Sequence, residues 1–259
     1  MDYDDHHSIT ENSRHTILEM WETVFSENAI SAGQVLEIGC GTGQLTAALT
    51  ALPSIQYLHA TDISEQFLHI TKTAVGKSQK PVLYYACDAN HLPFADNSFD
   101  TIVANSVLHH LLDFTDVLKQ CVRLLKPGGF AVFFEPVLQG KIMVAFLADL
   151  LLRINQKTGY GELTDEDRHK ISRMIRHITK SRDIGDDREK LAAMEDKYVF
   201  DLHDLQAAAK RSGFSETTHR NNPAQDGNYR FNLHQHLRMA GIDEEKLKSF
   251  RFLTNAAHD

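Results

Sequence analysis

The sequence has few cysteines, and their placement argues against two kinds of cross-link. Its 259 residues include three, Cys40, Cys87 and Cys121, which lie far apart and form no CxxC pair. An odd and scattered set favours neither a disulfide framework nor a structural zinc site, and it is typical of a reducing compartment. We therefore expect a cytoplasmic location and no metal centre.

The sequence also lacks a signal segment and a long hydrophobic run. The N-terminus, MDYDDHHSIT, is acidic and polar, without the charged and then apolar pattern of a signal peptide. The longest apolar stretch, residues 142–152, is interrupted by Asp149 and is too short to span a bilayer. We expect a soluble chain with no membrane partner.

Positive charge is scarce as well. The formal net charge is −8, whereas a surface that binds duplex nucleic acid usually has a basic balance. There is no NPPY-type motif for the amines of flipped bases, and no basic face is evident. The composition therefore favours a small-molecule partner over nucleic acid. We expect the protein to be a monomer or a homodimer.

Apolar runs typical of buried strands alternate with helical segments over the first half of the chain. Strands are predicted at 34–39, 55–63, 81–89, 99–107 and 130–136. Helices are predicted between them at 42–52, 64–75 and 113–125, with Ser64 as N-cap, Gly76 as the stop of the second and KPGG as the break after the third. This alternation predicts βαβ units, hence an α/β fold with a parallel sheet covered by helices.

The flanking segments are predicted to be mostly helical. Residues 14–25 form an amphipathic helix, which would belong to an N-terminal helical lid at 1–33, ahead of the main domain at 34–259. A helical insert at 138–195 carries an apolar stripe and a helix, IMVAFLADLLLRI, that would either line an acceptor pocket or serve as a buried or dimer-forming helix. After a helix that ends at Gly213, a further strand is expected. NYRFNLHQHLRM (228–239) would be the last strand, with two histidines on one face but no third metal ligand.

The run VLEIGCGTGQ (35–44) places three glycines between the first predicted strand and its helix. Glycine allows a tight turn there and lets a ligand approach the backbone without a Cβ in the way. The spacing is GxGxG, whereas the dinucleotide fingerprint needs its third glycine one place later, where this chain has Gln44. Asp62, about twenty places on at the end of the second strand, could chelate ribose hydroxyls or take part in capping the next helix.

Three further motifs follow in order: CDA (87–89) with the turn-rich HLPFADNSFD (91–100), then NSVLHHLLD (105–113), then LLKPGGFAVFFEP (124–136). Together with the glycine run, they resemble the class I S-adenosylmethionine-dependent methyltransferases, and most closely the ubiquinone/menaquinone-biosynthesis-like small-molecule branch. The resemblance covers about residues 34–136. It implies a Rossmann-like sheet of seven strands in the order 3-2-1-4-5-7-6, with the seventh antiparallel. It also implies an enzyme that methylates a small organic acceptor and yields S-adenosylhomocysteine.

The resemblance assigns cofactor-binding roles to residues at the predicted strand ends. Those near the methionine part would be Glu37, Gly39, Cys40, Gly41 and Gly43. Asp62 would take the ribose hydroxyls, and Ile63 would pack on the adenine. Asp88 would accept a hydrogen bond from the adenine amino group, with Ala89 adding backbone contact, and Asn105 would face the amino-acid end.

Catalysis would require in-line alignment, exclusion of water and, for an acidic acceptor, a general base. The candidates for that base are His110, His109 and Glu135, with His6 and His7 as further candidates if the N-terminus closes over the site. Oxygen is favoured as the acceptor atom over carbon and nitrogen. Two alternatives stay open: a protein that binds the cofactor without methylating, such as a regulatory subunit or a cyclase, and a nicotinamide-dependent oxidoreductase.

Overall fold

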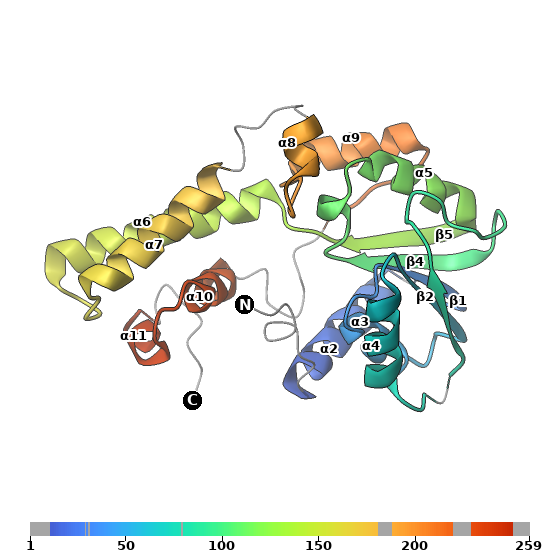
Figure 1. The fold of residues 1–259 in the computed structure, drawn as a ribbon, viewed down its shortest axis with the longest axis horizontal. Helices are drawn as coiled ribbons and strands as arrows, with labels where there is room; N and C mark the ends of the chain where they lie inside the picture. The colour runs from blue at the N-terminus through green and yellow to red at the C-terminus, as the bar shows by residue number, and fades with distance from the viewer. Residues whose placement is uncertain are drawn as a thin grey trace. The chain divides into compact units, whose positions relative to one another are not determined.

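The computed structural model describes residues 11–28, 30, 32–78, 80–180, 188–219 and 229–250. The chain divides into two compact units, residues 1–135 with 203–224, and residues 136–202 with 225–259. The first unit contains the sheet, and the second consists mainly of helices (Figure 1).

The first unit is built on a parallel sheet of five strands in the order β3-β2-β1-β4-β5. The strands are β1 (Gln34–Ile38), β2 (Tyr57–Asp62), β3 (Val82–Ala86), β4 (Phe99–Asn105) and β5 (Leu125–Phe134). Ile38, at the end of β1, pairs with Thr61 of β2 and with Ala104 of β4. The carboxyl ends of these strands therefore meet at one edge of the sheet.

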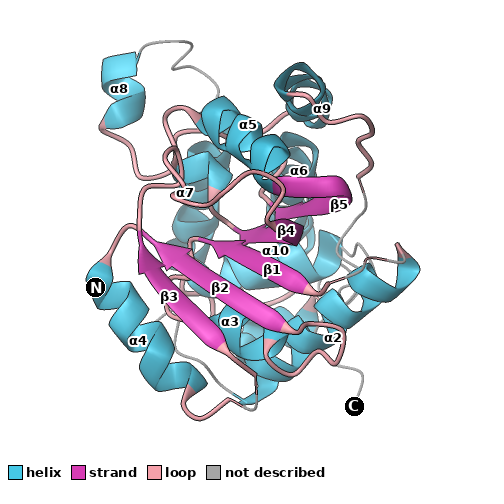
Figure 2. Ribbon diagram, turned by 90° about the vertical axis from the view of Figure 1, so that its right-hand side faces the viewer, coloured by secondary structure: helices cyan, strands magenta, loops and turns pink. Residues whose placement is uncertain are grey.

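Helices cover both faces of this sheet (Figure 2). On one face lie α2 (Glu11–Glu27), α3 (Gln44–Leu49) and α4 (Glu65–Val75), and on the other lie α5 (Phe114–Leu124) and α9 (Leu202–Ser212). The core under α2 and α3 includes Trp21, Val35, Leu45, Leu49, Leu58 and Val103. The ring of Trp21 packs edge-on against Phe134, with 5.0 Å between the ring centroids. The prediction of an α/β Rossmann-like fold is confirmed.

Local signals fix the ends of α4 as the sequence predicted. The Ser64 hydroxyl accepts a hydrogen bond from the backbone N–H of Phe67 at 3.3 Å, and Gly76 follows the last turn with a φ of 60°. A side-chain acceptor satisfies one of the free N–H groups at a helix start, and glycine enters left-handed backbone conformations at little cost.

The predicted helix 113–125 does end next to KPGG, but the predicted start of the following strand at residue 130 is wrong. The helix α5 ends at Leu124, and β5 begins at once with Leu125, so that KPGG lies inside the strand. A Cβ on Gly129 would lie 2.8 Å from the carbonyl oxygen of Asp100, and the register of the β4–β5 pair shifts between Phe99 and Thr101. Glycine is therefore needed for close approach of the two strands here, and it does not end the pairing.

Residues 138–195, predicted to be mostly helical, fall in the second unit, and their described parts are mostly helical. The helices of this unit are α6 (Leu138–Thr158), α7 (Asp165–Lys180), α8 (Arg188–Ala192), α10 (Tyr229–Met239) and α11 (Glu244–Ser249). The predicted apolar stripe of α7 is confirmed, because Ile171 and Ile178 are buried and Met174 and Ile175 pack against the same core. Other members of that core are Val144, Leu151, Leu233, Leu237 and Phe250.

The prediction of a last strand at 228–239 is wrong. Residues 229–239 form α10, in which Leu233 and Leu237, four positions apart, are fully buried. Within the parts of the first unit that the structure describes, no strand follows β5, and residues 220–228 lie outside the described residues. The observed order agrees with the 3-2-1-4-5 part of the expected sheet.

The N-terminal helix α2 is longer than the predicted segment 14–25 and packs against α3. Residues 1–10, which include His6 and His7, lie outside the described residues, so that the lid stays a prediction. Among the helices that the structure describes, none combines the length and the apolar character needed to cross a bilayer.

Candidate active site

The glycine turn between β1 and α3 lies at the carboxyl edge of the sheet, and its three glycines serve two purposes. Gly39, Gly41 and Gly43 all have positive φ, at 68°, 52° and 87°. A Cβ on Gly39 would lie 2.6 Å from a methyl of Val107, and one on Gly43 would lie 2.9 Å from the Cα of Thr71. A Cβ on Gly41 would meet nothing within 4 Å. Two glycines thus permit close packing, while Gly41 leaves open space over the turn.

Three hydrogen bonds hold the glycine turn against β2 and α4. The N–H of Cys40 donates to the carbonyl of Thr61 at 2.9 Å, and the N–H of Gly41 donates to Oδ2 of Asp62 at 2.9 Å. The hydroxyl of Thr71 donates to the carbonyl of Gly41 at 2.7 Å. The backbone of the turn is therefore preformed before any ligand is bound.

Asp62 ends β2, and both of its carboxylate oxygens accept backbone hydrogen bonds. Oδ2 takes the N–H of Gly41, and Oδ1 takes the N–H of Ser64 at 2.9 Å. The side-chain cap of α4 is Ser64, so that Asp62 supports the helix start without capping it itself. Its neighbour Ile63 is 76% exposed, which leaves an apolar surface beside the carboxylate.

Glu37 in β1 is buried without a hydrogen-bond partner. It is 1% exposed, and no described residue forms a hydrogen bond with either of its side-chain oxygens. Burial raises the pKa of Glu37 to about 8. Polar contacts from the side chain and backbone of Thr46, which fall outside ordinary hydrogen-bond geometry, partly oppose the rise, and the negative charge of Asp62 adds to it. A buried acid without a partner is costly, so that this carboxyl fits a ligand that brings a donor or a positive charge.

Cys40, in the same turn, is not a reactive thiol. It is buried, and burial together with the negative charge of Glu37 raises the pKa of its thiol. A thiol held in its protonated form is a poor nucleophile. Its place in the turn serves packing against Ala60 and Leu68.

Asp88 and Ala89 form a turn directly after β3. Oδ1 of Asp88 accepts the N–H of Asn90 at 2.8 Å, and Oδ2 lies 3.8 Å from Nδ1 of His91. The side chain of Asp88 is about half-exposed, at 46%. The N–H of Cys87 donates to the carbonyl of Asp62 at 3.0 Å, and this bond holds the ends of β2 and β3 together.

The tip of β4 leads into a short 3₁₀ helix, η1 (Leu108–His110), that Glu135 organises. Asn105 is exposed, and Ser106 has a left-handed φ of 59°. Oε1 of Glu135 accepts the N–H groups of Val107 and Leu108 at 2.9 and 2.8 Å. Oε1 of Glu135 thus holds the backbone that follows the tip of β4.

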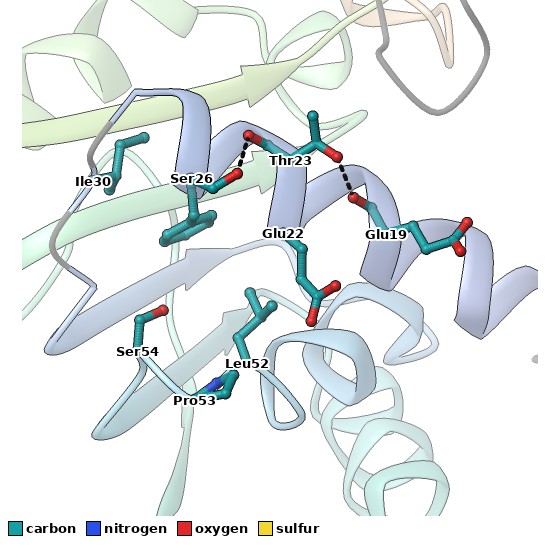
Figure 3. Close-up of a pocket in the computed structure, with 9 residues that line it drawn as sticks. Glu19, Glu22, Thr23, Ser26, Ile30, Leu52, Pro53 and Ser54 are labelled. Atoms are coloured by element: carbon teal, nitrogen blue, oxygen red, sulfur yellow. Dashed lines mark hydrogen bonds between the residues drawn. The ribbon is translucent and has the colours of Figure 1, made fainter.

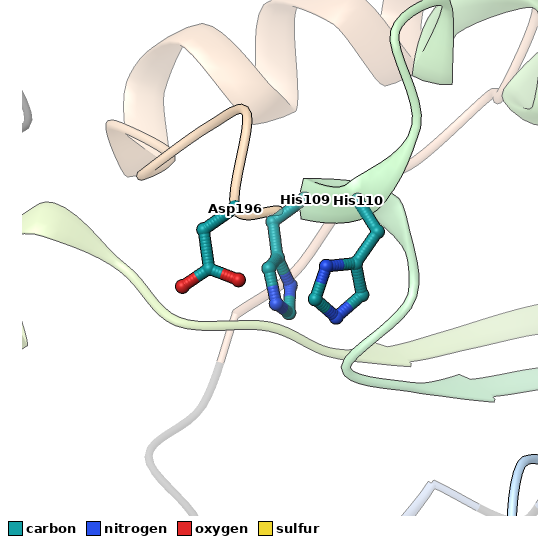
Figure 4. A group of neighbouring side chains, drawn as sticks. All are labelled: His109, His110 and Asp196. Carbon is teal, nitrogen blue, oxygen red and sulfur yellow. The ribbon is translucent and has the colours of Figure 1, made fainter. Parts of the chain in front are cut away.

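His109 and Glu135, two of the predicted catalytic residues, are in direct contact. Nδ1 of His109 lies 2.6 Å from Oε2 of Glu135, and the two side chains are 7% and 2% exposed. The ring of His110 lies beside that of His109, with 4.0 Å between centroids and 44° between planes (Figure 4). Asp196, also drawn there, belongs to the second unit.

The other predicted histidine pair does not assemble. His234 and His236 are on α10, in the second unit, and not on a strand. His234 contacts Glu244 at 3.0 Å through Nε2, whereas Nδ1 of His236 bonds to the carbonyl of Asn232 in its own helix. Positions two apart on a helix point in different directions, so that the shared face expected for a strand is lost.

Sequence reasoning missed Thr71, Val107 and Thr46, which surround the turn. Thr71 is fully buried, and its position in the stripe Leu68, Thr71 and Val75 of α4 was a usable signal, because a polar residue in a buried stripe needs a partner. Val107 and Thr46 carried no comparable signal, since their contacts depend on how β4 and α3 pack.

A hollow of about 830 Å³ lies elsewhere on the first unit and is open to solvent (Figure 3). Its lining includes Glu19 and Glu22 of α2 and residues 52–54. Those residues precede β2, at the amino ends of the strands. The hollow therefore lies away from the glycine turn and the carboxyl edge.

Comparison with known proteins agrees with the geometry of this edge. A family profile described as "Methyltransferase domain" matches residues 36–133. Methyltransferase GfsG of Streptomyces halstedii is 32% identical over 126 residues, which cover 48% of this chain and 45% of that protein. Demethylmenaquinone methyltransferase of Staphylococcus aureus is 37% identical over 103 residues, 39% of this chain and 42% of that one. The aligned regions thus span less than half the length of these relatives.

The fold has a solved counterpart over most of the chain. A crystal structure from Bacillus halodurans, described as a candidate methyltransferase, matches with a TM-score of 0.53 and 16% identity. The match covers 91% of this chain and 83% of that one. At that identity the likeness concerns the fold alone.

Proposed function

Residues 36–133 belong to the class I S-adenosylmethionine-dependent methyltransferases, and we propose that this chain transfers a methyl group from S-adenosylmethionine to a small organic acceptor. Oxygen is the favoured acceptor atom, ahead of carbon and nitrogen. The observation that carries the proposal is Glu37, a buried carboxyl without a partner beside a preformed glycine turn.

The edge offers a suitable group for each part of the cofactor. Glu37 would receive the ammonium of the methionine part, next to the open space over Gly41. Asp62, whose carboxylate is held in place by two backbone N–H groups, would receive the ribose hydroxyls. The exposed side chain of Ile63 would pack against the adenine.

The remaining contacts follow the same edge. Asp88 would accept the adenine amino group, with Ala89 adding backbone contact, and Asn105 would face the amino-acid end through its backbone. When bound, the sulfonium supplies a methyl group that is already activated. The protein would then hold acceptor and methyl group in line and exclude water, contributions of roughly 7–11 kcal/mol in favourable cases.

Binding is tested by titrating the full chain with S-adenosylhomocysteine and, separately, with NADH in a calorimeter. We expect one site for the first ligand and none for the second; the reverse result would support an oxidoreductase. Gly41→Val should abolish binding by filling the open space over the turn.

Gly159→Val is the matched control for that variant. Gly159 also has positive φ (69°) and open space around a Cβ, but it lies at the end of α6 in the second unit. Backbone strain is thus similar in the two variants. If both lose binding equally, the loss reports strain and not a blocked approach.

Transfer is tested by incubating the protein with methyl-labelled S-adenosylmethionine and a metabolite extract. A transferase moves the label to an extract component. Binding without transfer would instead favour a protein that holds the nucleoside for another purpose.

A further inference from the structure

The strand β3 lies at one margin of the sheet, and half of its backbone groups point away from β2 (Figure 2). On the inner side, the N–H of Leu58 donates to the carbonyl of Pro81, and the N–H of Cys87 donates to the carbonyl of Asp62. In a parallel ladder, alternate residues of a strand turn both their N–H and their C=O to the same side. Pro81, Cys87 and the odd positions between them therefore face β2. The residues that present both groups outward are Val82, Tyr84 and Ala86.

These outward groups are free over the part of the chain that the structure describes. No described residue forms a hydrogen bond with the N–H or C=O of Val82, Tyr84 or Ala86. No residue of β3 is fully buried, whereas four of the five residues of β1 are. The strand is still held firmly, because the side chains of Val82 and Tyr84 pack against a core that includes Leu68 of α4.

β3 also lacks the features by which proteins block an exposed edge. Natural edge strands often carry a lysine, a proline or a bulge that hinders pairing with a further strand. At the opposite margin of the described sheet, β5 has Lys126, Pro127 and a register shift beside Thr101. The sequence of β3, VLYYA, has no charge and no proline, and its pairing with β2 shows no shift. Its edge is therefore open to an additional strand.

A second copy of β3, antiparallel to the first about a two-fold axis at Tyr84, matches this edge completely. In antiparallel pairs, two opposite residues can exchange both of their backbone hydrogen bonds. About this axis Tyr84 meets Tyr84 of the partner subunit, and Val82 meets Ala86 of the partner subunit. Every outward N–H and C=O of the strand then has a partner. A register shifted by two positions would leave Val82 or Ala86 beyond the end of the other strand.

The side chains on the far face of β3 match in the same register. Because Val82 and Tyr84 point towards α4, Leu83 and Tyr85 point to the other face of the sheet. Leu83 would stand opposite Tyr85 of the partner subunit, and it is now 44% exposed. An aliphatic side chain and an aromatic one across two strands stabilise their pairing.

The charges at the two ends of the strand match as well. In this register Lys80 stands opposite Asp88 of the partner subunit. Nζ of Lys80 is buried, and none of the described residues accepts a hydrogen bond from it. A buried ammonium without a partner is costly, and the flexible stem of lysine lets it turn towards a carboxylate. The side chain of Asp88 is 46% exposed.

We propose that this chain forms a homodimer in which the β3 edges of two copies pair antiparallel, so that their sheets join into one. The pairing is closed, since each copy uses its open edge once and its other edge, β5, is blocked. The dimer does not depend on methyl transfer, and its tests need no cofactor.

The oligomeric state is measured by analytical ultracentrifugation of the full chain over a range of concentrations. We expect a dimer that Ala86→Pro and Leu83→Lys each weaken, with the dimer Kd raised about tenfold or more. Ala86→Pro removes an outward N–H and leaves the ladder with β2 intact, as proline on an edge strand can. Leu83→Lys changes only a half-exposed side chain and places a charge at the pairing face.

Tyr57→Lys is the matched control for Leu83→Lys. Tyr57 is 43% exposed and lies on the same face of the sheet, but on β2, one strand in from the edge. It should dimerise as wild type, and thermal unfolding of each variant checks that it is folded. If Tyr57→Lys and Leu83→Lys weaken the dimer equally, β3 is not the interface.

The register is tested in the wild-type protein with a carbodiimide, which joins a lysine amine directly to a carboxylate. Lys80 and Asp88 of one chain lie at opposite ends of β3, roughly 20 Å apart at ~3.3 Å per residue, so that a link between them reports two copies. In a mixture of ¹⁴N and ¹⁵N protein, mass spectrometry should find this link between peptides of different label. Lys80→Arg keeps the charge and should dimerise without forming the link.

Three results would overturn the proposal. They are a monomer at every concentration, a dimer whose Kd both edge variants leave unchanged, and a dimer that forms no link between Lys80 and Asp88. Loss of methyl transfer or of cofactor binding would bear on the proposed function alone.

Discussion

The hydroxyl of Thr71 donates a 2.7 Å hydrogen bond to the carbonyl of Gly41, thirty residues earlier in the chain. Thr71 is fully buried on α4, and its Cα would lie only 2.9 Å from a Cβ added at Gly43. One threonine therefore holds the glycine turn in shape from the helix that follows β2. The preformed turn depends on this contact as much as on its glycines.

Thr71→Val should weaken binding of S-adenosylhomocysteine, because the Gly41 carbonyl loses its donor while the volume of the side chain is kept. A lost hydrogen bond of this kind costs about 1 kcal/mol, or roughly fivefold in affinity. Thr71→Ser keeps the hydroxyl and should bind as wild type in the same titration. Equal affinity of the valine and serine variants would contradict this role.

Asp62→Ala should weaken binding of S-adenosylhomocysteine by about 1–3 kcal/mol, since ribose hydroxyls would lose their acceptor. The N–H groups of Gly41 and Ser64 would lose theirs too, so that the melting temperature must be followed beside the titration. Asp116→Ala, an exposed carboxylate of α5 paired with Lys119, is the control. A folded Asp62→Ala protein with unchanged affinity would rule out the ribose assignment.

Binding of S-adenosylhomocysteine at pH 7 should release about one proton per site, because Glu37 would ionise when it meets the ligand ammonium. Its pKa in the free protein, raised to about 8 by burial, keeps it mostly protonated at that pH. Titration in two buffers of different ionisation enthalpy measures the release. Glu37→Gln should bind more weakly and release correspondingly fewer protons; an unchanged proton count in that variant would contradict the assignment.

Glu37→Gln should also stabilise the free protein above pH 8. A raised carboxyl pKa means that the native state holds a proton the unfolded chain has lost, so that the free energy of unfolding falls as pH rises from about 4.5 to about 8. Because the variant has no carboxyl at this position, its free energy of unfolding should exceed that of the wild type by roughly 1–4 kcal/mol above pH 8. Urea unfolding at pH 4 and pH 8.5 should show a difference only at the higher pH.

Asp167 in the second unit predicts the opposite pH dependence. Burial would raise its pKa, but hydrogen bonds from Lys246 and Thr164 lower it to about 2. These hydrogen bonds stabilise the native state at pH values above 3.8, the pKa of Asp167 in the unfolded chain. The stabilisation, roughly 2 kcal/mol in total, is lost as the pH falls towards 2.

Asp167→Asn should therefore lower the free energy of unfolding at pH 7 and change it little at pH 2. Asp165→Asn, whose side chain is fully exposed, is the matched control in the same first turn of α7. Urea unfolding at both pH values measures the effect. Equal stability of the two variants at pH 7 would contradict the role of the Asp167 network.

The elements that the sequence predicted well are those set by local signals. Ser64 and Gly76 bound α4 because a cap and a glycine stop act within one turn of the helix. The prediction failed at 228–239, where Phe231, Leu233 and Leu237 fall on alternate positions that resemble a strand. The pair Leu233 and Leu237 suits a helix equally well, and burial in the helical core of the second unit decided between the two periods.

The candidate site was predictable in its positions but not in its partners. Asp62, Asp88 and Asn105 could be placed at strand ends because parallel strands end at one edge. The pairing of His109 with Glu135 joins residues 26 apart, and its 2.6 Å contact depends on how β5 ends beside β4. The lack of a partner for Glu37 is likewise a property of packing that no local pattern encodes.

The most direct test of the central claim is a crystal structure of the chain with S-adenosylhomocysteine. We predict density along the carboxyl edge, with the ribose on Asp62, the adenine on Ile63 and the ammonium within hydrogen-bonding distance of Glu37. Density only in the hollow beside Glu19 and Glu22, or an edge left without ligand at saturating concentration, would contradict the account.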